Sequence, residues 1–137
     1  MSRFMQRKED YKNALKRLED ALAENMDNLS ENAKDAIIDG VLHRFEFTFE
    51  LAWKTMKDYL EYLGVTEKNG SPRENIQLAF KQEIIDDGEI WIEIMLSRNE
   101  LSHLYDEEAS REIYEDIKNK YIIEFRKLND KFMQINI

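Results

Sequence analysis

The sequence predicts an all-α protein, an up-and-down bundle of about five helices. Only one proline and four glycines occur in 137 residues, and apolar residues recur at spacings of three and four along nearly the whole chain. The breaks between the periodic segments are short, as in helical bundles. A chain of this length falls within the usual size of one domain. We therefore expect residues 1–137 to form a single helical domain.

The composition limits the classes of function. The chain has no cysteine, which excludes disulfides and thiolate metal sites. A formal net charge of −9 argues against broad binding to nucleic acid or anionic membrane, although a small local phosphate site is compatible with it. The N-terminus is charged and no apolar run approaches the ~20 residues of a membrane span. We expect a cytoplasmic protein without a membrane partner.

Two long helices are predicted in the first half of the chain. The first covers about residues 4–26 and carries an apolar stripe. The second extends over 30–63, with Ser30 as its N-cap and Gly64 as the residue that ends it. Phe47 widens its apolar face, so this helix should be central and should contact neighbours on more than one side. The stripe of the first helix consists of Tyr11, Leu15, Leu18 and Leu22.

A capping box predicts where the third helix begins. Ser71 and Glu74 flank Pro72, which is favoured at the first helical position. The apolar pattern then continues to Ile84, and the pair Asp87-Gly88 breaks it. We therefore expect a short helix after the one clear loop of the chain, at residues 64–71.

Two further helices complete the prediction. Residues 89–104 are dense in apolar groups, so this fourth helix should be buried or lie at an interface. Asp106 can cap a last long helix, because apolar residues recur after it every three or four positions. These residues are Ile113, Ile117, Tyr121, Phe125, Leu128 and Phe132.

One polar stripe on the second helix permits two interpretations. His43, Glu46, Glu50 and Lys54 return to the same helical face, and two carboxylates beside a histidine resemble half of a metal site. Bundles that bind two metal ions take such ligands from several helices, and the matching Glu-x-x-His segments do not occur here. We interpret the stripe as a polar face with a Glu50–Lys54 ion pair and predict no metal ligands. Phosphate-binding and dinucleotide-binding motifs do not occur either, so we predict no cofactor.

The candidate site is the segment Arg98, Asn99, His103 and Tyr105. On a regular helix, Arg98 and Tyr105 share a face, whereas His103 points ~140° away from Arg98. The two side chains can meet if the helix loosens before Asp106, or if two copies share a cleft across a two-fold axis. A histidine and an arginine in one cleft could cleave RNA without a metal ion. Alternatively, Arg98 is a bundle arginine paired with a nearby acid and His103 only ends a helix.

These residues carry a resemblance to a known family. Arg98-Asn99-x3-His103 resembles the R-polar-x3-H signature of the HEPN superfamily, and RNELSHLY resembles its longer R-x4-H-x-Y form. The segments FEFTFELAWKTMKDYLEYLG (45–64), SPRENIQLAF (71–80) and MLSRNELSHLYDEE (95–108) are similar to the nucleotidyltransferase substrate-binding protein family within that superfamily. The resemblance covers about residues 5–133.

The resemblance implies a function and an assembly. Members of this family are helical homodimers, encoded beside a minimal nucleotidyltransferase, with the arginine and histidine of both subunits in a shared cleft. In toxin–antitoxin pairs the HEPN protein is an RNase, with RNA as substrate, and the partner silences it by transferring AMP to the motif tyrosine. Arg98 and His103 would then be catalytic, Asn99 would help to bind substrate and Tyr105 would accept AMP. The alternative is a noncatalytic substrate-binding or adaptor subunit of the nucleotidyltransferase, with a nucleotide as ligand.

Overall fold

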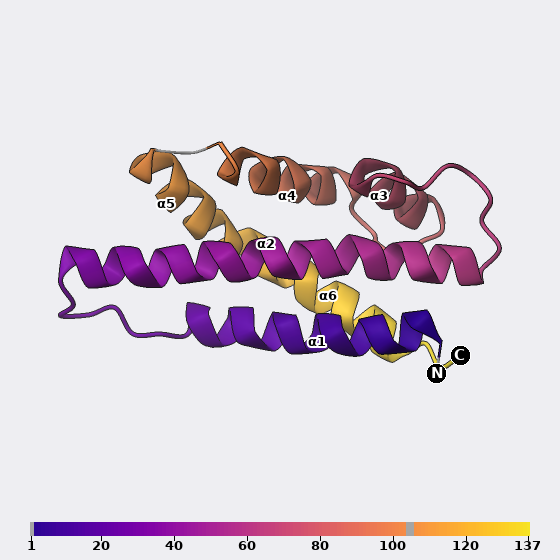
Figure 1. Ribbon diagram of the computed structural model, residues 1–137, viewed down its shortest axis with the longest axis horizontal. Coiled ribbons are helices and arrows are strands. Elements are labelled where there is room, and N and C mark those ends of the chain that lie inside the picture. Colours follow the sequence, from indigo (N-terminus) through magenta and orange to yellow (C-terminus); the bar gives the residue numbers. More distant parts are fainter. Residues whose placement is uncertain (1, 104–105) are drawn as a thin grey trace.

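The computed structural model describes residues 2–103 and 106–137, and these residues form a bundle of helices (Figure 1). The segments α5, η1 and α6 follow one another without a break and form one C-terminal rod, so the described residues form five successive helical rods, as predicted. No strand occurs in the described ranges. The elements are α1 (Arg3–Leu22), α2 (Glu31–Tyr62), α3 (Pro72–Lys81), α4 (Gly88–Leu101), α5 (Glu107–Asp116), the π-helical segment η1 (Ile117–Tyr121) and α6 (Ile122–Met133).

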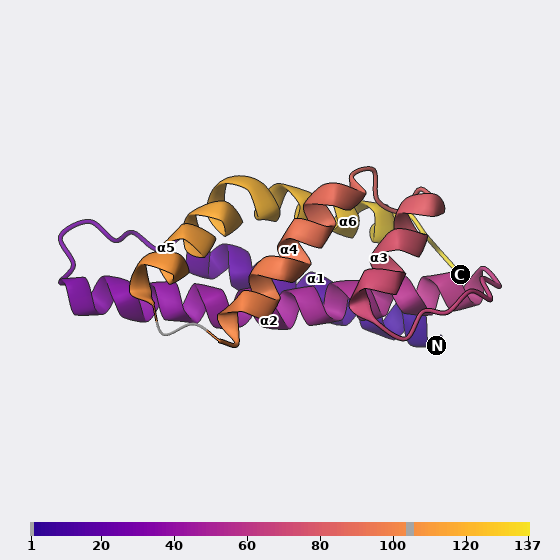
Figure 2. The same ribbon diagram turned by 90° about the horizontal axis from the view of Figure 1, so that it is seen from above.

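The long helix α2 organises the bundle. It extends along the whole molecule, with α1 antiparallel along one side and α3 and α4 along the other (Figure 1). The rod of α5, η1 and α6 begins near the end of α4, crosses behind α2 in the view of Figure 1 and ends beside α1 (Figures 1 and 2). The prediction of a central second helix with several neighbours is therefore confirmed.

Aromatic side chains fill the core where α2, α4 and the C-terminal rod meet. Phe45 stacks on Tyr121 and on Phe125, with ring centroids 5.9 Å apart in both pairs. Trp91 packs on Phe125 at 5.4 Å. All these rings are nearly or fully buried. Burial of such large side chains is a dominant source of stability in a domain of this size.

The predicted caps are present in the structure. The Ser30 side chain accepts a hydrogen bond from the Ala33 amide at 3.1 Å. Ser71 and Glu74 form both halves of a capping box, which satisfies amides that have no partner within the helix. Gly64, directly after the C-cap of α2, has a φ of +80°, a conformation that favours glycine. The sequence therefore located these three helix ends correctly.

Two of the early helices are shorter than the periodicity indicates. α1 ends at Leu22 instead of Met26, and Asn28 reverses the chain with a φ of +65°. α3 ends at Lys81 instead of Ile84, because Glu83 adopts a φ of +60°. Apolar residues that continue a helical spacing can therefore lie in a turn that packs on the same core.

Several residues of the predicted apolar faces are exposed. Phe47 is 59% exposed, and Phe80 and Leu96 are each 51% exposed. The prediction that Phe47 widens the packed face of α2 is therefore wrong: the residue lies on the outward face of that helix. Within the described ranges, no helix is both long enough and apolar enough to cross a membrane.

The buried Lys8 joins the two ends of the chain. Its amine donates hydrogen bonds to the carbonyls of Ile135 at 2.7 Å and Phe132 at 3.4 Å. The start of α1 and the C-terminal tail consequently lie at the same end of the bundle (Figures 1 and 2). Two carbonyl partners satisfy an ammonium group that would be costly to bury alone.

Candidate functional site

The candidate segment begins in the last turn of α4 and continues beyond it. The helix ends at Leu101, so the prediction that it continues to residue 104 is wrong. The Ser102 hydroxyl donates to the Asn99 carbonyl at 2.7 Å, and the His103 amide donates to the Glu100 carbonyl at 2.9 Å. These i→i−3 bonds tighten the chain after α4. The regular helix therefore ends before His103, so the helical geometry that points its side chain away from Arg98 does not apply to this residue.

Arg98 is held by a residue of another helix. Its Nη2 atom donates to Glu50 Oε2 of α2 at 3.0 Å. The same carboxylate accepts a hydrogen bond from Trp53 Nε1 at 3.1 Å and pairs with Lys54 Nζ at 3.3 Å. Glu50 therefore fixes the direction of the guanidinium, while about a third of each side chain, 34% for Arg98 and 32% for Glu50, remains exposed.

Glu50 is the site residue that sequence reasoning missed. The Glu50–Lys54 ion pair was predicted correctly, but nothing in the spacing along α2 indicates a contact with residue 98. A usable signal was the run Glu50-x-x-Trp53-Lys54, which puts a carboxylate, an indole N–H and an amine on one helical turn beside the core. Such a turn can present an oriented carboxylate to a neighbouring helix.

A second set of hydrogen bonds anchors the residue before Arg98. Ser97 Oγ lies 2.7 Å from the Tyr121 hydroxyl, and that hydroxyl donates to Glu93 Oε2 at 2.9 Å. Burial raises the pKa of Tyr121 well above its usual value, so the phenol keeps its proton, and Ser97 must be the donor in the first bond. Lys120 completes the set with an ion pair to Glu93 at 2.8 Å.

The π-helical segment positions this tyrosine. A π turn contains one residue more than an α turn and therefore rotates the side chains that follow it. Tyr121 is the last residue of η1, and it lies between the core ring of Phe45 and the polar atoms of Ser97 and Glu93. The last two turns of α4 are thus anchored to the C-terminal rod at Ser97 and to α2 at Arg98.

The other predicted site residues are less constrained. Asn99 is exposed, and its Oδ1 atom lies 3.4 Å from Arg98 Nη1. His103 is exposed in the turn after α4, and among the described residues no hydrogen bond links its imidazole to Arg98. Tyr105 lies outside the described residues. The structure therefore brings together Arg98, Asn99 and Glu50, with His103 two residues beyond the end of α4.

Comparison with known proteins identifies the family. A family model described as nucleotidyltransferase substrate binding protein like matches residues 6–134. The chain belongs to this family, within the HEPN superfamily. The probable ribonuclease HepT of Haemophilus influenzae is 30% identical to it over 106 residues, which are 75% of this chain and 72% of that protein.

Two solved structures share the fold of this HEPN protein. One, from Haemophilus influenzae, is described as the substrate binding domain of a nucleotidyltransferase. It superposes with a TM-score of 0.82 at 24% identity, over 93% of this chain and 99% of its own. The other, from Thermus thermophilus, has a TM-score of 0.65 at 23% identity, over 90% and 96% of the two chains.

Basic groups are few around the segment of this HEPN protein that carries the motif. Arg73 and Lys81 lie on α3, at the opposite end of α4 (Figure 1). Arg111 is paired with Asp35 at 2.8 Å and with Glu31 at 3.5 Å. Glu50 contacts Arg98, and the motif is flanked in the sequence by four further carboxylates, at Glu100, Asp106, Glu107 and Glu108.

His43 does not take part in this arrangement. It is exposed on α2, beside a shallow pocket that Arg17, Arg44 and Phe47 also line. No group of three or more histidine, aspartate or glutamate residues in the described ranges could hold a metal ion. The exposure of His43 and the Glu50–Lys54 ion pair agree with the interpretation of the stripe as a polar face.

Proposed function

We propose that this protein is a metal-independent endoribonuclease in which Arg98 and His103 are catalytic. The observation that carries the proposal is the Arg98–Glu50 contact of 3.0 Å. It holds a partly exposed guanidinium, which shares its carboxylate partner with Lys54, beside a turn that carries an exposed histidine. Oriented guanidinium groups bind phosphate through two parallel hydrogen bonds. The similarity to a probable ribonuclease supports the same class of reaction.

The proposed chemistry needs one proton acceptor and one proton donor. The ribose 2′-oxygen attacks phosphorus while an imidazole takes its proton, and the bond from phosphorus to the 5′-oxygen breaks. The leaving 5′-oxygen receives a proton from an imidazolium. The products are a 2′,3′-cyclic phosphate and a 5′-hydroxyl, and Arg98 stabilises the charge that grows on the phosphoryl oxygens. The His103 residues of two protomers would supply the two roles.

A two-fold dimer would supply that pair of histidines. Phe47 is 59% exposed on the outward face of α2, and Gly40 lies two turns earlier on the same face. A glycine inside a helix costs roughly 0.5–1 kcal/mol relative to alanine, yet no atom lies within 4 Å of the Cβ that Gly40 lacks. Close approach of α2 from a second copy would explain both the exposed ring of Phe47 and the glycine at position 40.

Tyr105 would be the switch of this enzyme. A partner nucleotidyltransferase would transfer AMP from ATP to its hydroxyl and release pyrophosphate and the phenolic proton. The new phosphodiester anion, seven residues from Arg98 in the sequence, would compete with RNA phosphate for that guanidinium. The R-x4-H-x-Y spacing and the family membership support this assignment. Incubation with the nucleotidyltransferase, ATP and Mg²⁺ should add one AMP per chain by intact mass, and Tyr105→Phe should abolish the addition.

RNA cleavage by purified variants tests the nuclease site. Arg98→Ala and His103→Ala should each reduce cleavage at least ~100-fold, with unchanged circular dichroism. Arg111→Ala is the matched control, because it removes an arginine that is already paired with Asp35 and Glu31. Equal cleavage by Arg98→Ala and wild type would disprove the site.

The dimer has its own test. Phe47→Asp should convert a dimer to a monomer in sedimentation equilibrium and should abolish cleavage at the same time. Ile123→Asp, at a 50% exposed position on α6, should leave the dimer intact. A wild-type protein that is monomeric at micromolar concentration would contradict the shared cleft.

One observation favours a second function, a noncatalytic substrate-binding subunit of a nucleotidyltransferase. The carboxylates around Arg98 and the net charge of −9 disfavour an RNA backbone, for which a nuclease would usually offer a basic path. In that case the pure protein would not cleave RNA. It would instead lower the KM of the nucleotidyltransferase for its substrate.

A further inference from the structure

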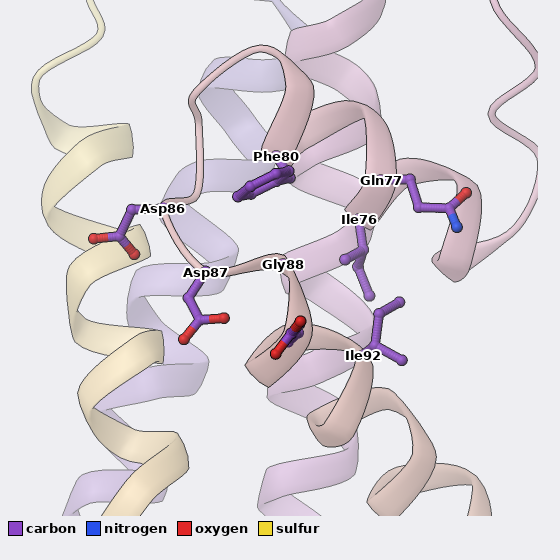
Figure 3. Close-up of a pocket in the computed structure, with 8 residues that line it drawn as sticks. Ile76, Gln77, Phe80, Asp86, Asp87, Gly88 and Ile92 are labelled. Atoms are coloured by element: carbon purple, nitrogen blue, oxygen red, sulfur yellow. The ribbon is translucent and has the colours of Figure 1, made fainter.

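A pocket outside the candidate site lies at the opposite end of α4. It has a volume of about 600 Å³ and opens where the turn after α3 leads into α4 (Figure 3). Ile76, Phe80 and Ile92 supply its apolar surface. A volume of this size can accommodate one or two large side chains or a small ligand.

Phe80 forms one wall of this pocket, and its ring packs closely against the backbone of a glycine. The ring is 51% exposed although it belongs to the short helix α3. A Cβ atom on Gly88 would lie 3.2 Å from the ring, which is closer than ordinary van der Waals contact. The glycine at the start of α4 therefore allows the ring to lie against the backbone, with its other side facing the pocket (Figure 3).

The ionisable groups of the pocket are all acidic. Asp86, Asp87 and Glu89 line it, and no lysine or arginine does so among the described residues. Lys127 pairs with Asp86 at 2.9 Å, and this hydrogen bond lowers the pKa of Asp86, so the group is ionised at neutral pH. Asp87 accepts a hydrogen bond from the Ile90 amide at 3.1 Å. Glu89 remains exposed at the edge of the pocket.

The apolar surface extends beyond the pocket. Leu96 lies one turn after Ile92 on the same face of α4 and is 51% exposed. An apolar pocket that continues into an exposed apolar residue is longer than a small ligand requires. It is typical of surfaces that bind an extended or helical protein segment.

We propose that this pocket binds a basic amphipathic segment of another protein, with a bulky apolar side chain between Phe80 and Ile92 and lysine or arginine side chains against Asp87 and Glu89. The charges disfavour the two main alternatives. Nucleotides and RNA carry phosphates, which the carboxylates of Asp87 and Glu89 repel. A two-fold contact between copies centred on this pocket would put Asp87 and Glu89 against their own counterparts.

Three fluorescein-labelled peptides of ten residues test this proposal. The probe has a central Leu-Phe pair flanked by two arginines and two lysines. The first control replaces the basic residues with glutamates, and the second replaces the Leu-Phe pair with serines. By fluorescence anisotropy, the probe should bind with a Kd on the order of 10–100 μM, more weakly at high salt, and both controls should bind at least ~10-fold more weakly.

Variants of the intact protein localise the binding. Phe80→Ser should weaken probe binding at least ~5-fold, and Glu89→Gln should weaken it ~2- to 5-fold. Ile123→Ser, at a similarly exposed position on α6, should have no effect. Because Phe80→Ser could perturb α3, methyl NMR of wild type gives a second measurement: the signals of Ile76 and Ile92 should shift on titration.

Three results would overturn the proposal. One is equal binding of the basic and acidic peptides, and another is probe binding that Phe80→Ser and Glu89→Gln leave unchanged. The third is a wild-type dimer that Glu89→Arg dissociates, which would assign the pocket to a second copy of the chain. None of these measurements depends on RNA cleavage, so the proposal can fail or succeed independently of the nuclease.

Discussion

The two ends of α4 carry opposite chemistry, and they are held in different ways. At the N-terminal end, Asp87 and Glu89 surround an apolar pocket, and the capping bond of Asp87 is formed within three residues of the chain. At the C-terminal end, Arg98 depends on Glu50, 48 residues earlier in the sequence. Acidic residues at the start of a helix and basic residues at its end also complement the helix dipole.

The difference shows how far local rules extend. The place where α4 begins, at its acidic end, follows from the Asp87 cap. Capping bonds join residues two or three positions apart and can be predicted from the sequence. The direction of Arg98 follows from packing of α4 against α2, which no local rule specifies. A helix can therefore present one surface by local chemistry and another by tertiary contact, and substitutions should affect the two ends differently.

The largest expected effect is a loss of RNA cleavage, caused by a substitution at the basic C-terminal end of α4. Arg98→Lys keeps the charge but loses the planar fork that contacts Glu50 and that would bind phosphate in the proposed reaction, so RNA cleavage should fall roughly 10- to 100-fold. Glu89→Gln, at the acidic end of the same helix, should cleave RNA at the wild-type rate. Equal losses in the two variants would show that the ends of α4 do not act separately.

Tyr121→Phe tests the hydrogen bonds that anchor α4, between its two ends, to the C-terminal rod. The substitution removes the hydroxyl that contacts Ser97 and Glu93 and should reduce the free energy of unfolding by about 1–2 kcal/mol. Urea denaturation followed by circular dichroism measures it. Tyr114→Phe is a suitable control because that residue is also buried on the C-terminal rod. Similar losses in both variants would argue against a special role for Tyr121.

A smaller effect is expected when the partner of Arg98 is neutralised. Glu50→Gln keeps a hydrogen-bond acceptor but removes the charge from an ion pair that is about one-third exposed, so stability should fall by only about 0.5–1 kcal/mol. Cleavage should fall through kcat more than through KM, because the guanidinium remains but its direction is less fixed. An unchanged kcat would mean that Glu50 does not position Arg98.

The smallest expected effect is a pH dependence. Hydrogen bonds from Lys127 and Lys120 lower the pKa values of Asp86 and Glu93 in the folded state. A lowered folded-state pKa contributes stability above the unfolded-state pKa of about 4, and this contribution is lost as pH falls through the folded-state value. The decrease in Tm between pH 6 and pH 3 should be smaller in Asp86→Asn and Glu93→Gln. A decrease in Tm as large as that of wild type would show that these two carboxylates do not contribute to the pH dependence.

Most of the fold could be predicted because helix starts and apolar periodicity are local. The caps at Ser30, Ser71 and Asp106 lie where the sequence indicates. The π turn was not predictable, since one extra residue scarcely changes a spacing of three and four. Exposure of Phe47 was also missed, because periodicity identifies an apolar face but does not say whether this chain or another covers it.

At the candidate segment, the contact between Arg98 and Glu50 was not predicted. The alternative interpretation of Arg98, pairing with a nearby acid, is confirmed by Glu50, and the same contact supports the catalytic proposal. The early end of α4 at Leu101 depends on a single turn of i→i−3 bonds, which sequence periodicity cannot resolve. The roles of Arg98, Asn99, His103 and Tyr105 stay predictions that the experiments above address.

The bonds of Lys8 to the carbonyls of Ile135 and Phe132 have a mechanical consequence. Because both termini lie at one end of the bundle (Figure 1), a force applied through them would separate α1 from α6 one turn at a time, beginning at the termini. Arg98 and Glu50 would carry no load until those helices had separated. In an optical trap, the molecule should therefore open at low force from its terminal end, with the contact between α2 and α4 among the last to break.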